Sequence, residues 1–276
     1  MSETRLNTGV EVTQALDKIR FGHGDHIGNV REFNEDNYAC EPGMGLWVVA
    51  DGMGGHECGD VASRIAVDFI VEQVRQGHEL QDAIEQAHKI IHLAAEQNLG
   101  MPGMGSTVVA LRLKEDRFEV GWVGDSRAYL VGKGSLYQIS RDHSFVQQMI
   151  DAGELSHLEA RSHPYRNVIT QALGASDLQE VNAGYVEGVF FRDHQILLCS
   201  DGLTSEVGEI ELREALIGDL SEQQKVDVLI QSALDNGGAD NVTVVVVSAP
   251  DDAPAKPEED PTIPMDIETV RKVIGH

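Results

Sequence analysis

Four aspartates stand at the ends of apolar segments in this 276-residue chain. They are Asp51 after LWVVA, Asp125 after VGWVG, Asp201 after ILLCS and Asp240 before NVTVVVV. Short runs rich in Val, Leu and Ile predict buried strands. Carboxylates gathered at one rim repel each other unless a cation lies between them. Because oxygen ligands without matching His or Cys suit hard ions, the pattern favours Mg²⁺ or Mn²⁺ over zinc and predicts a metal-dependent enzyme.

Each of these aspartates, taken alone, is better explained as a turn residue. Asp before Gly is common in turns, because Asp bonds to its own backbone and Gly tolerates positive φ. Asp125 and Asp240, however, are not followed by Gly, and a turn does not require so apolar a neighbouring strand. The set of four therefore favours a metal site, and a turn role stays the alternative for each member.

Two other segments carry reactive side chains. Residues 31–36, REFNED, join a cation to two carboxylates, and Arg31 could hold a phosphate by two parallel hydrogen bonds or form a plain surface ion pair. In DGMGGH at 51–56, the glycines let the backbone approach a metal, so the Gly52 carbonyl can serve as a ligand. His56 could protonate a leaving alkoxide or be merely structural. A glycine-rich phosphate cradle is disfavoured because the segment lacks GxxxxGK[ST].

The elements between these motifs must bring the strand ends together. The periodicity predicts helices over 61–74 and 80–98, and strands over 105–113, 117–123 and 127–131. Predicted helix caps are Asp60, Asp142, Ser156 and Ser221, the last two in capping-box patterns with Glu159 and Gln224. Strands with grouped helix pairs predict an α+β domain, with a central β-sandwich of two antiparallel sheets flanked by helix pairs in α-β-β-α layers.

Composition restricts the possible partners. The formal net charge of −25 argues against binding to nucleic acid or to an anionic membrane, and no apolar run is long enough to cross a bilayer. The first residues lack a basic segment followed by an apolar stretch, so we expect no secretory signal. Three cysteines without CxxC spacing fit a reduced, cytoplasmic protein, and Cys199 within ILLCS fits the core. We expect a monomer.

The motifs together resemble the metal-dependent Ser/Thr protein phosphatases of type 2C, in particular the bacterial branch. In the order of that family, they are RxxNED at 31–36, DGMGGH at 51–56, GSTVV at 105–109, GDSR at 124–127, DHS at 142–144, HPYRNVITQALG at 163–174, LLCSDGL at 197–203 and DN at 240–241. The resemblance covers residues 21–248. We therefore expect an N-terminal extension over 1–20, the phosphatase domain over 21–248 and a disordered Pro- and acid-rich tail over 249–276.

The resemblance also implies roles for single residues. Two Mn²⁺ or Mg²⁺ ions would be held by Asp51 as the bridging ligand, the Gly52 carbonyl, Asp201, Asp240 and, directly or through water, Glu35 or Asp36. A weaker third ion would use Asp125, with Asp201 and the backbone at Asn167. Arg31 would hold the substrate phosphate, His56 would be the general acid, and residues 145–173 would form a mobile flap subdomain.

The expected function is metal-dependent hydrolysis of phosphoserine and phosphothreonine in proteins by an activated water. The partners would be phosphorylated proteins and a bacterial Ser/Thr kinase that the enzyme opposes. One alternative is a regulatory switch phosphatase or a binding protein for a single phosphorylated partner, and another is a hydrolase of small phosphate esters. A cysteine-based phosphatase is disfavoured because Cys199, at the end of an apolar run, is followed by SDGLTS and lacks the arginine of a Cys-x₅-Arg loop.

Overall fold

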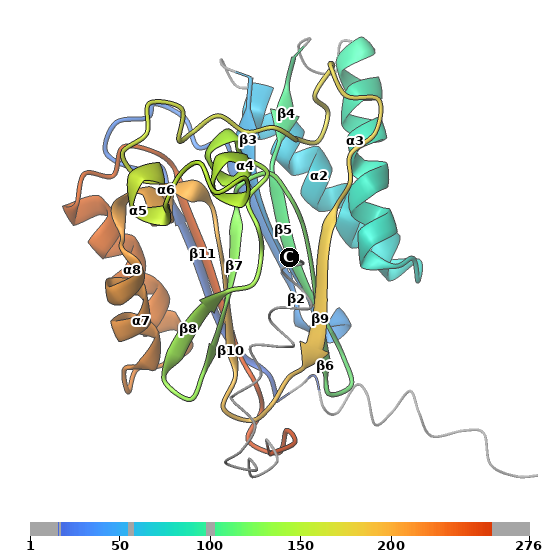
Figure 1. Cartoon of the computed structure of the whole chain (residues 1–276). Helices are drawn as coiled ribbons and strands as arrows, with labels where there is room; N and C mark the ends of the chain where they lie inside the picture. The colour runs from blue at the N-terminus through green and yellow to red at the C-terminus, as the bar shows by residue number, and fades with distance from the viewer. Residues whose placement is uncertain (1–15, 17, 55–57, 98–102, 256–276) are drawn as a thin grey trace, which may run out of the picture.

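The computed structural model describes residues 16, 18–54, 58–97 and 103–255, which form two antiparallel sheets packed face to face (Figure 1). From edge to edge, the first sheet contains β1 (Arg20–His26), β11 (Val242–Ser248), β10 (Gln195–Cys199), β7 (Arg127–Gly132) and β8 (Ser135–Gln138). The second contains β2 (Asp36–Glu41), β3 (Leu46–Met53), β5 (Val108–Lys114), β6 (Arg117–Val123) and β9 (Gly184–Val189), with β4 (Gly105–Ser106) paired to the end of β3.

Helices cover the outer faces of both sheets (Figure 1). The second sheet is covered by α2 (Cys58–Arg75) and α3 (Leu80–Glu96), and the first by α6 (Asp201–Glu206), α7 (Glu209–Ile217) and α8 (Glu222–Asp235). A short 3₁₀ helix, η1 (Pro42–Met44), joins β2 to β3. The predicted α+β sandwich in α-β-β-α layers is therefore confirmed, with three helices rather than a pair on the first sheet.

Burial on both faces explains why the central strands are almost wholly apolar. In β3, Trp47 and Val49 pack between the two sheets, whereas Val48 and Ala50 pack against the helices. Strand β11 alternates in the same way, and every one of its residues is buried. A strand that is covered on both faces needs a continuous apolar run, so its polar residues must lie at its ends.

The flap is an excursion between β8 and β9 that carries α4 (Phe145–Asp151) and α5 (His157–Ala160). Its two ends are joined, because the Phe145 N–H donates to the Val168 carbonyl at 2.8 Å and the Thr170 N–H donates to the His143 carbonyl at 2.7 Å. Leu173, at the C-terminal end of the flap, and Ser106 of β4 each donate a backbone hydrogen bond to the other, which fixes this end of the flap to β4.

Of the four predicted helix caps, two are confirmed and two are wrong. Both capping boxes, at Ser156 and Ser221, are confirmed. The Asp60 prediction is wrong, because α2 already includes Cys58 and places Asp60 within its first turn. The Asp142 prediction is also wrong: Ser144 caps α4, since its hydroxyl accepts from the Gln147 N–H, while Asp142 is paired with an arginine.

Two further boundaries shift. The predicted strand over 105–113 is divided at Thr107 into β4 and β5. After β11, residues 249–255 pack back onto the sandwich: Ala249 and Ala253 are buried, and the Arg192 N–H donates to the Pro254 carbonyl at 3.0 Å. The compact part therefore continues beyond the predicted boundary at 248, and the rest of the predicted tail lies outside the described residues. None of the helices in the described ranges is long and apolar enough to cross a membrane.

Candidate metal centre

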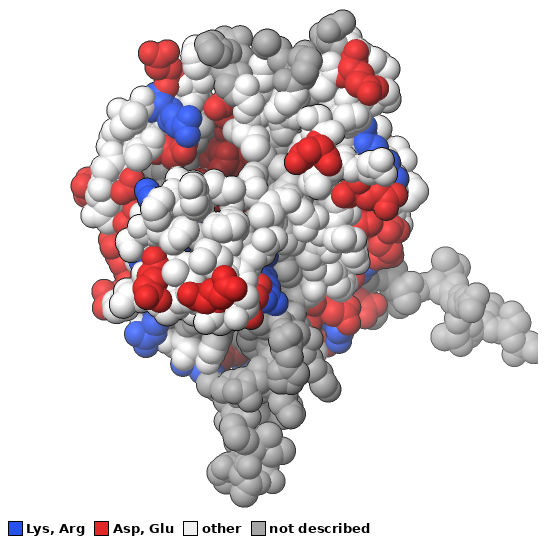
Figure 2. Space-filling view, turned by 45° about the horizontal axis from the view of Figure 1, so that its top comes forward, with Lys and Arg blue, Asp and Glu red and all other residues white. Residues whose placement is uncertain are grey.

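The carboxylates converge where the ends of the two sheets meet. Asp36 and Asp51 are register partners on β2 and β3. Asp201 follows β10, and Asp240 lies just before β11, the neighbour of β10 in the other sheet. Asp51 and Asp201 come from different sheets but lie close enough for the charge of Asp201 to act on Asp51. Figure 2 shows acidic side chains inside a hollow on this face of the molecule.

Asp36 is the most deeply enclosed of these groups, with 6% of its surface exposed. One of its oxygens, Oδ2, accepts from the Ser200 hydroxyl at 2.8 Å and from the Thr243 hydroxyl at 2.7 Å. The other, Oδ1, is buried without a hydrogen-bond partner in the described structure. Burial raises the pKa of Asp36 to about 7, and the nearby charges of Asp201 and Asp240 add to the effect.

The neighbouring carboxylates are perturbed in the same direction. Burial raises the pKa of Asp51 well above its usual range, and the charges of Asp36 and Asp201 raise it further. Burial and then the charge of Asp240 raise the pKa of Asp201, and burial and then the charge of Asp201 raise that of Asp125 to about 8. Several acids crowded in a dry site fit divalent cations, which would offset both the desolvation and the mutual repulsion.

Glycine at two positions allows the elements to approach this closely. A Cβ at Gly52 would lie 2.0 Å from the Gly59 carbonyl oxygen in the first turn of α2. A Cβ at Gly202 would lie 1.9 Å from the Asn241 carbonyl oxygen. Gly52 lets the end of β3 approach the start of α2, and Gly202 lets the start of α6 approach the loop at 240–241. Each glycine directly follows a candidate ligand aspartate, so neither Asp-Gly pair is a free turn.

Glu35 and Arg31 lie on the loop before β2. The Glu35 carboxylate accepts from the Gly59 N–H at 3.1 Å, which orients it across the start of α2. The Arg31 guanidinium, 49% exposed, donates to Asp240 at 2.6 Å. The ion pair that the sequence allowed for Arg31 is therefore present, with a candidate ligand as its partner, and its role in holding a phosphate stays a prediction.

Of the two remaining predicted site residues, the structure describes only Asp125. His56 lies outside the described residues. Asp125 lies between β6 and β7, and it lines one cavity with Asp201 and Asn167, the three residues named for a third ion. Within the described ranges, no three His, Cys, Asp or Glu side chains form a group that could hold an ion by themselves. Mg²⁺ commonly uses one or two carboxylates and keeps several waters, so backbone oxygens and water would have to complete the coordination.

The sequence interpretation missed the residues that support the carboxylates. Ser200 and Thr243 hold Asp36, and the Thr107 hydroxyl, 2.7 Å from the Ser126 hydroxyl, accepts from the Asp51 N–H at 3.2 Å. A detectable signal was present for Thr243, a lone hydroxyl inside VTVVVV, since a buried polar side chain needs a partner.

Asn241 is the other missed residue. Its amide nitrogen donates to the carbonyls of Ile27 and Phe33, both at 2.9 Å, and its amide oxygen accepts from the Glu35 N–H at 2.8 Å. Asn241 therefore fixes the loop that carries Arg31 and Glu35.

Comparisons with known proteins agree with this geometry. Residues 24–241 match the model of the family protein phosphatase 2C, so the chain belongs to that family. The serine/threonine phosphatase stp of Listeria welshimeri is 37% identical over 80% of this chain and 92% of its own length. The Mycobacterium tuberculosis serine/threonine phosphatase PstP/Ppp superposes with a TM-score of 0.77, at 34% identity over 84% of this chain and 99% of the other. The catalytic domain of a PstP in complex with 2 manganese ions gives 0.74, at 32% identity over 83% and 97%.

Proposed function

We propose that this chain hydrolyses phosphoserine and phosphothreonine in proteins with the help of Mn²⁺ or Mg²⁺. The observation that carries the proposal is the convergence of acids from both sheets at one rim, where bound cations would offset their mutual repulsion. The relatives are Ser/Thr phosphatases by name, and one of them was solved with two manganese ions.

Asp51, the Gly52 carbonyl, Asp201 and Asp240 would hold two ions, supported by Glu35 and Asp36. Asp125 would contribute to a third, weaker site with Asp201. When bound, the ions supply the Lewis acidity that makes water nucleophilic near neutral pH. The buried hydroxyls of Ser200 and Thr243 hold the Asp36 carboxylate in place, and Asn241 holds the loop of Arg31 and Glu35.

The remaining steps belong to side chains of the chain itself. Arg31 binds oxygens of the phosphoryl group with the N–H donors that Asp240 does not use. Water attacks phosphorus in line, and the bond from phosphorus to the Ser or Thr oxygen breaks. His56 gives its proton to that leaving oxygen, and because water is the nucleophile, no covalent phosphoenzyme forms. The substrates are the products of a Ser/Thr kinase in the same cell.

A panel of phosphopeptides and small phosphate esters tests the proposal. We expect phosphopeptide hydrolysis that depends on added Mn²⁺ or Mg²⁺ and stops with a chelator. His56→Gln should slow alkyl phosphates more than aryl phosphates, because a good leaving group needs less protonation. Turnover in excess chelator, or inhibition by a thiol reagent alone, would contradict the proposed mechanism.

A further inference from the structure

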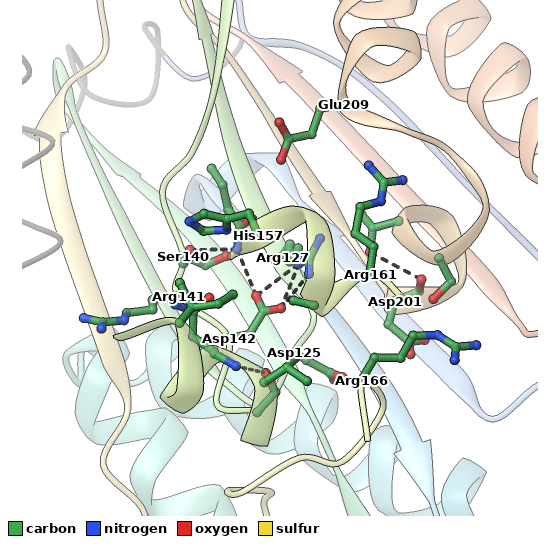
Figure 3. Close-up of a pocket in the computed structure, with 18 of the residues that line it drawn as sticks. Asp125, Arg127, Ser140, Arg141, Asp142, His157, Arg161, Arg166, Asp201 and Glu209 are labelled. Carbon is green, nitrogen blue, oxygen red and sulfur yellow. Dashed lines mark hydrogen bonds and ion pairs between the residues drawn. The ribbon is translucent and has the colours of Figure 1, made fainter. Parts of the chain in front are cut away.

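We call the group formed by Asp36, Asp51, Asp125, Asp201 and Asp240 the carboxylate centre. A cavity of about 560 Å³ extends from this centre into the space between the flap and helices α6 and α7 (Figure 3). We call it the flap cavity. Asp125 and Asp201 lie at the carboxylate centre, Arg161 and Arg166 come from the flap, and Glu209 comes from α7. A ligand at the centre could therefore extend along the cavity without leaving the protein surface.

Two other arginines of the flap cavity are committed to the protein's own carboxylates. Arg127 is half-buried and donates to both oxygens of Asp142 at 2.7–3.0 Å. Arg141 forms an ion pair with Asp151. These four charges cancel in pairs, so they stabilise the wall of the cavity and leave no net charge for a ligand.

Arg161 and Arg166 differ from that pair. Among the residues that the structure describes, neither guanidinium has a hydrogen-bond acceptor or an ion-pair partner. Arg161 lies against Gly208 at the start of α7, next to Glu209, yet it forms no ion pair with that carboxylate. Both side chains are exposed and both line the flap cavity, so they are free to pair with an anion that enters it.

We propose that Arg161 and Arg166 form a subsite for an anionic residue that flanks the phosphorylated Ser or Thr in a protein substrate. The inference rests on the proposed function, because it requires the phosphoryl group at the carboxylate centre. The planar guanidinium matches a carboxylate or a phosphate with paired N–H donors. Asp, Glu or a second phosphorylated residue would all supply that chemistry, and a neutral flanking residue would leave both arginines unpaired.

Three phosphothreonine peptides that differ at the flanking positions test the subsite: one with Gln, one with Glu and one with a second phosphothreonine. For the unaltered enzyme we expect kcat/KM for the two anionic peptides to exceed that for the Gln peptide by roughly tenfold, the factor expected from one charge-assisted hydrogen bond. The Arg161→Gln/Arg166→Gln double variant should lose this preference, mainly through KM. A preference for only one anionic peptide assigns the natural ligand, and an undiminished preference in the double variant overturns the proposal.

Two controls separate failure of the subsite from other failures. Arg192→Gln removes an exposed arginine from the turn between β9 and β10, outside the cavity, and should keep the preference. The charge-reversed variant Arg161→Glu/Arg166→Glu should favour a Lys-flanked peptide over a Glu-flanked one, which a merely damaged fold would not do. Hydrolysis of p-nitrophenyl phosphate by the unaltered enzyme is measured in parallel: its absence would refute the proposed function, whereas its presence without any anion preference refutes the subsite alone.

Discussion

Asp51 illustrates a conflict between stability and function at the scale of single residues. Its carboxylate is partly buried, and the charges of Asp36 and Asp201 act on it in the same direction as burial, so without cations an ionised Asp51 destabilises the fold. Asp51→Asn should therefore raise the unfolding midpoint of chelator-treated protein at pH 8 by about 2 °C or more, equivalent to about 1 kcal/mol. It should also lower phosphopeptide turnover at least about 100-fold.

Differential scanning calorimetry and phosphate release measure the two effects on the same preparation. A variant that loses both stability and activity would indicate a structural role for Asp51 and would count against the metal centre. Asp68→Asn, a substitution on the solvent face of α2, provides the control and should change neither quantity.

Asn241 permits a second prediction, for a residue that acts through another. Shortening the side chain removes its three hydrogen bonds to the loop at 27–35 and leaves partly buried backbone groups unpaired. Asn241→Ala should lower the free energy of unfolding by about 1–3 kcal/mol. Because the loop carries Arg31, KM for phosphopeptide should rise more than kcat falls. Steady-state kinetics with denaturant unfolding test this, and a change in kcat alone would remove Arg31 positioning from the explanation.

The candidate ligands could be predicted from the sequence because each stands at a sharp change from apolar to polar residues. The supporting residues could not be predicted equally well. Ser200 and Asn241 were visible as parts of motifs, but their hydrogen-bond partners are more than 160 positions away in the chain, at Asp36 and in the loop at 27–35. Such pairings depend on which strands become neighbours, and a single sequence does not specify that order.

At the scale of elements, the junction between β10 and α6 sets the distance between two candidate ligands. Gly202 lies in the first turn of α6, and a Cβ there would meet the Asn241 carbonyl oxygen at 1.9 Å. Gly202→Ala should push α6 away from the loop at 240–241, cost about 2 kcal/mol or more in stability and weaken Mn²⁺ binding. Gly43→Ala is the matched control, because nothing lies within 4 Å of its Cβ position and the change should stay within about 0.5 kcal/mol.

Thermal unfolding and Mn²⁺ titration of activity measure both variants. Equal behaviour of the Gly202 and Gly43 variants would show that the close approach at α6 is not required.

The sequence predicted α3 and β6 well, because their hydrophobic periodicities are strong. It misplaced helix starts at Asp60 and Asp142, since those side chains found tertiary partners: Asp60 accepts from Asn37 of β2, and Asp142 from Arg127.

At the scale of the whole molecule, the carboxylate centre couples folding, protons and cations. The chain carries a formal charge of −25, and the aspartates whose pKa values burial raises lie together at one end of the sandwich. In the folded state, the pKa of Asp36 is raised to about 7 and that of Asp125 to about 8. In the unfolded chain an aspartate titrates near about 3.9. Above that value the folded protein holds protons that the unfolded chain has released.

The sign of the pH dependence follows from this difference. Because the folded state binds more protons, the contribution of these acids to stability is fully present below pH ~4 and is lost as pH rises through about 8. Chelator-treated protein should therefore unfold at a lower temperature at pH 8.5 than at pH 5.5, a window above the titration of most surface carboxylates.

Mn²⁺ binds the ionised form of the folded state, so its stabilisation should grow with pH and reach about 2.7 kcal/mol at 100 times its dissociation constant. Asp125→Asn should flatten the slope without Mn²⁺. Unfolding midpoints that rise with pH in the chelator-treated protein would show that these acids are already ionised at no cost, and the cation site would lose its physical basis.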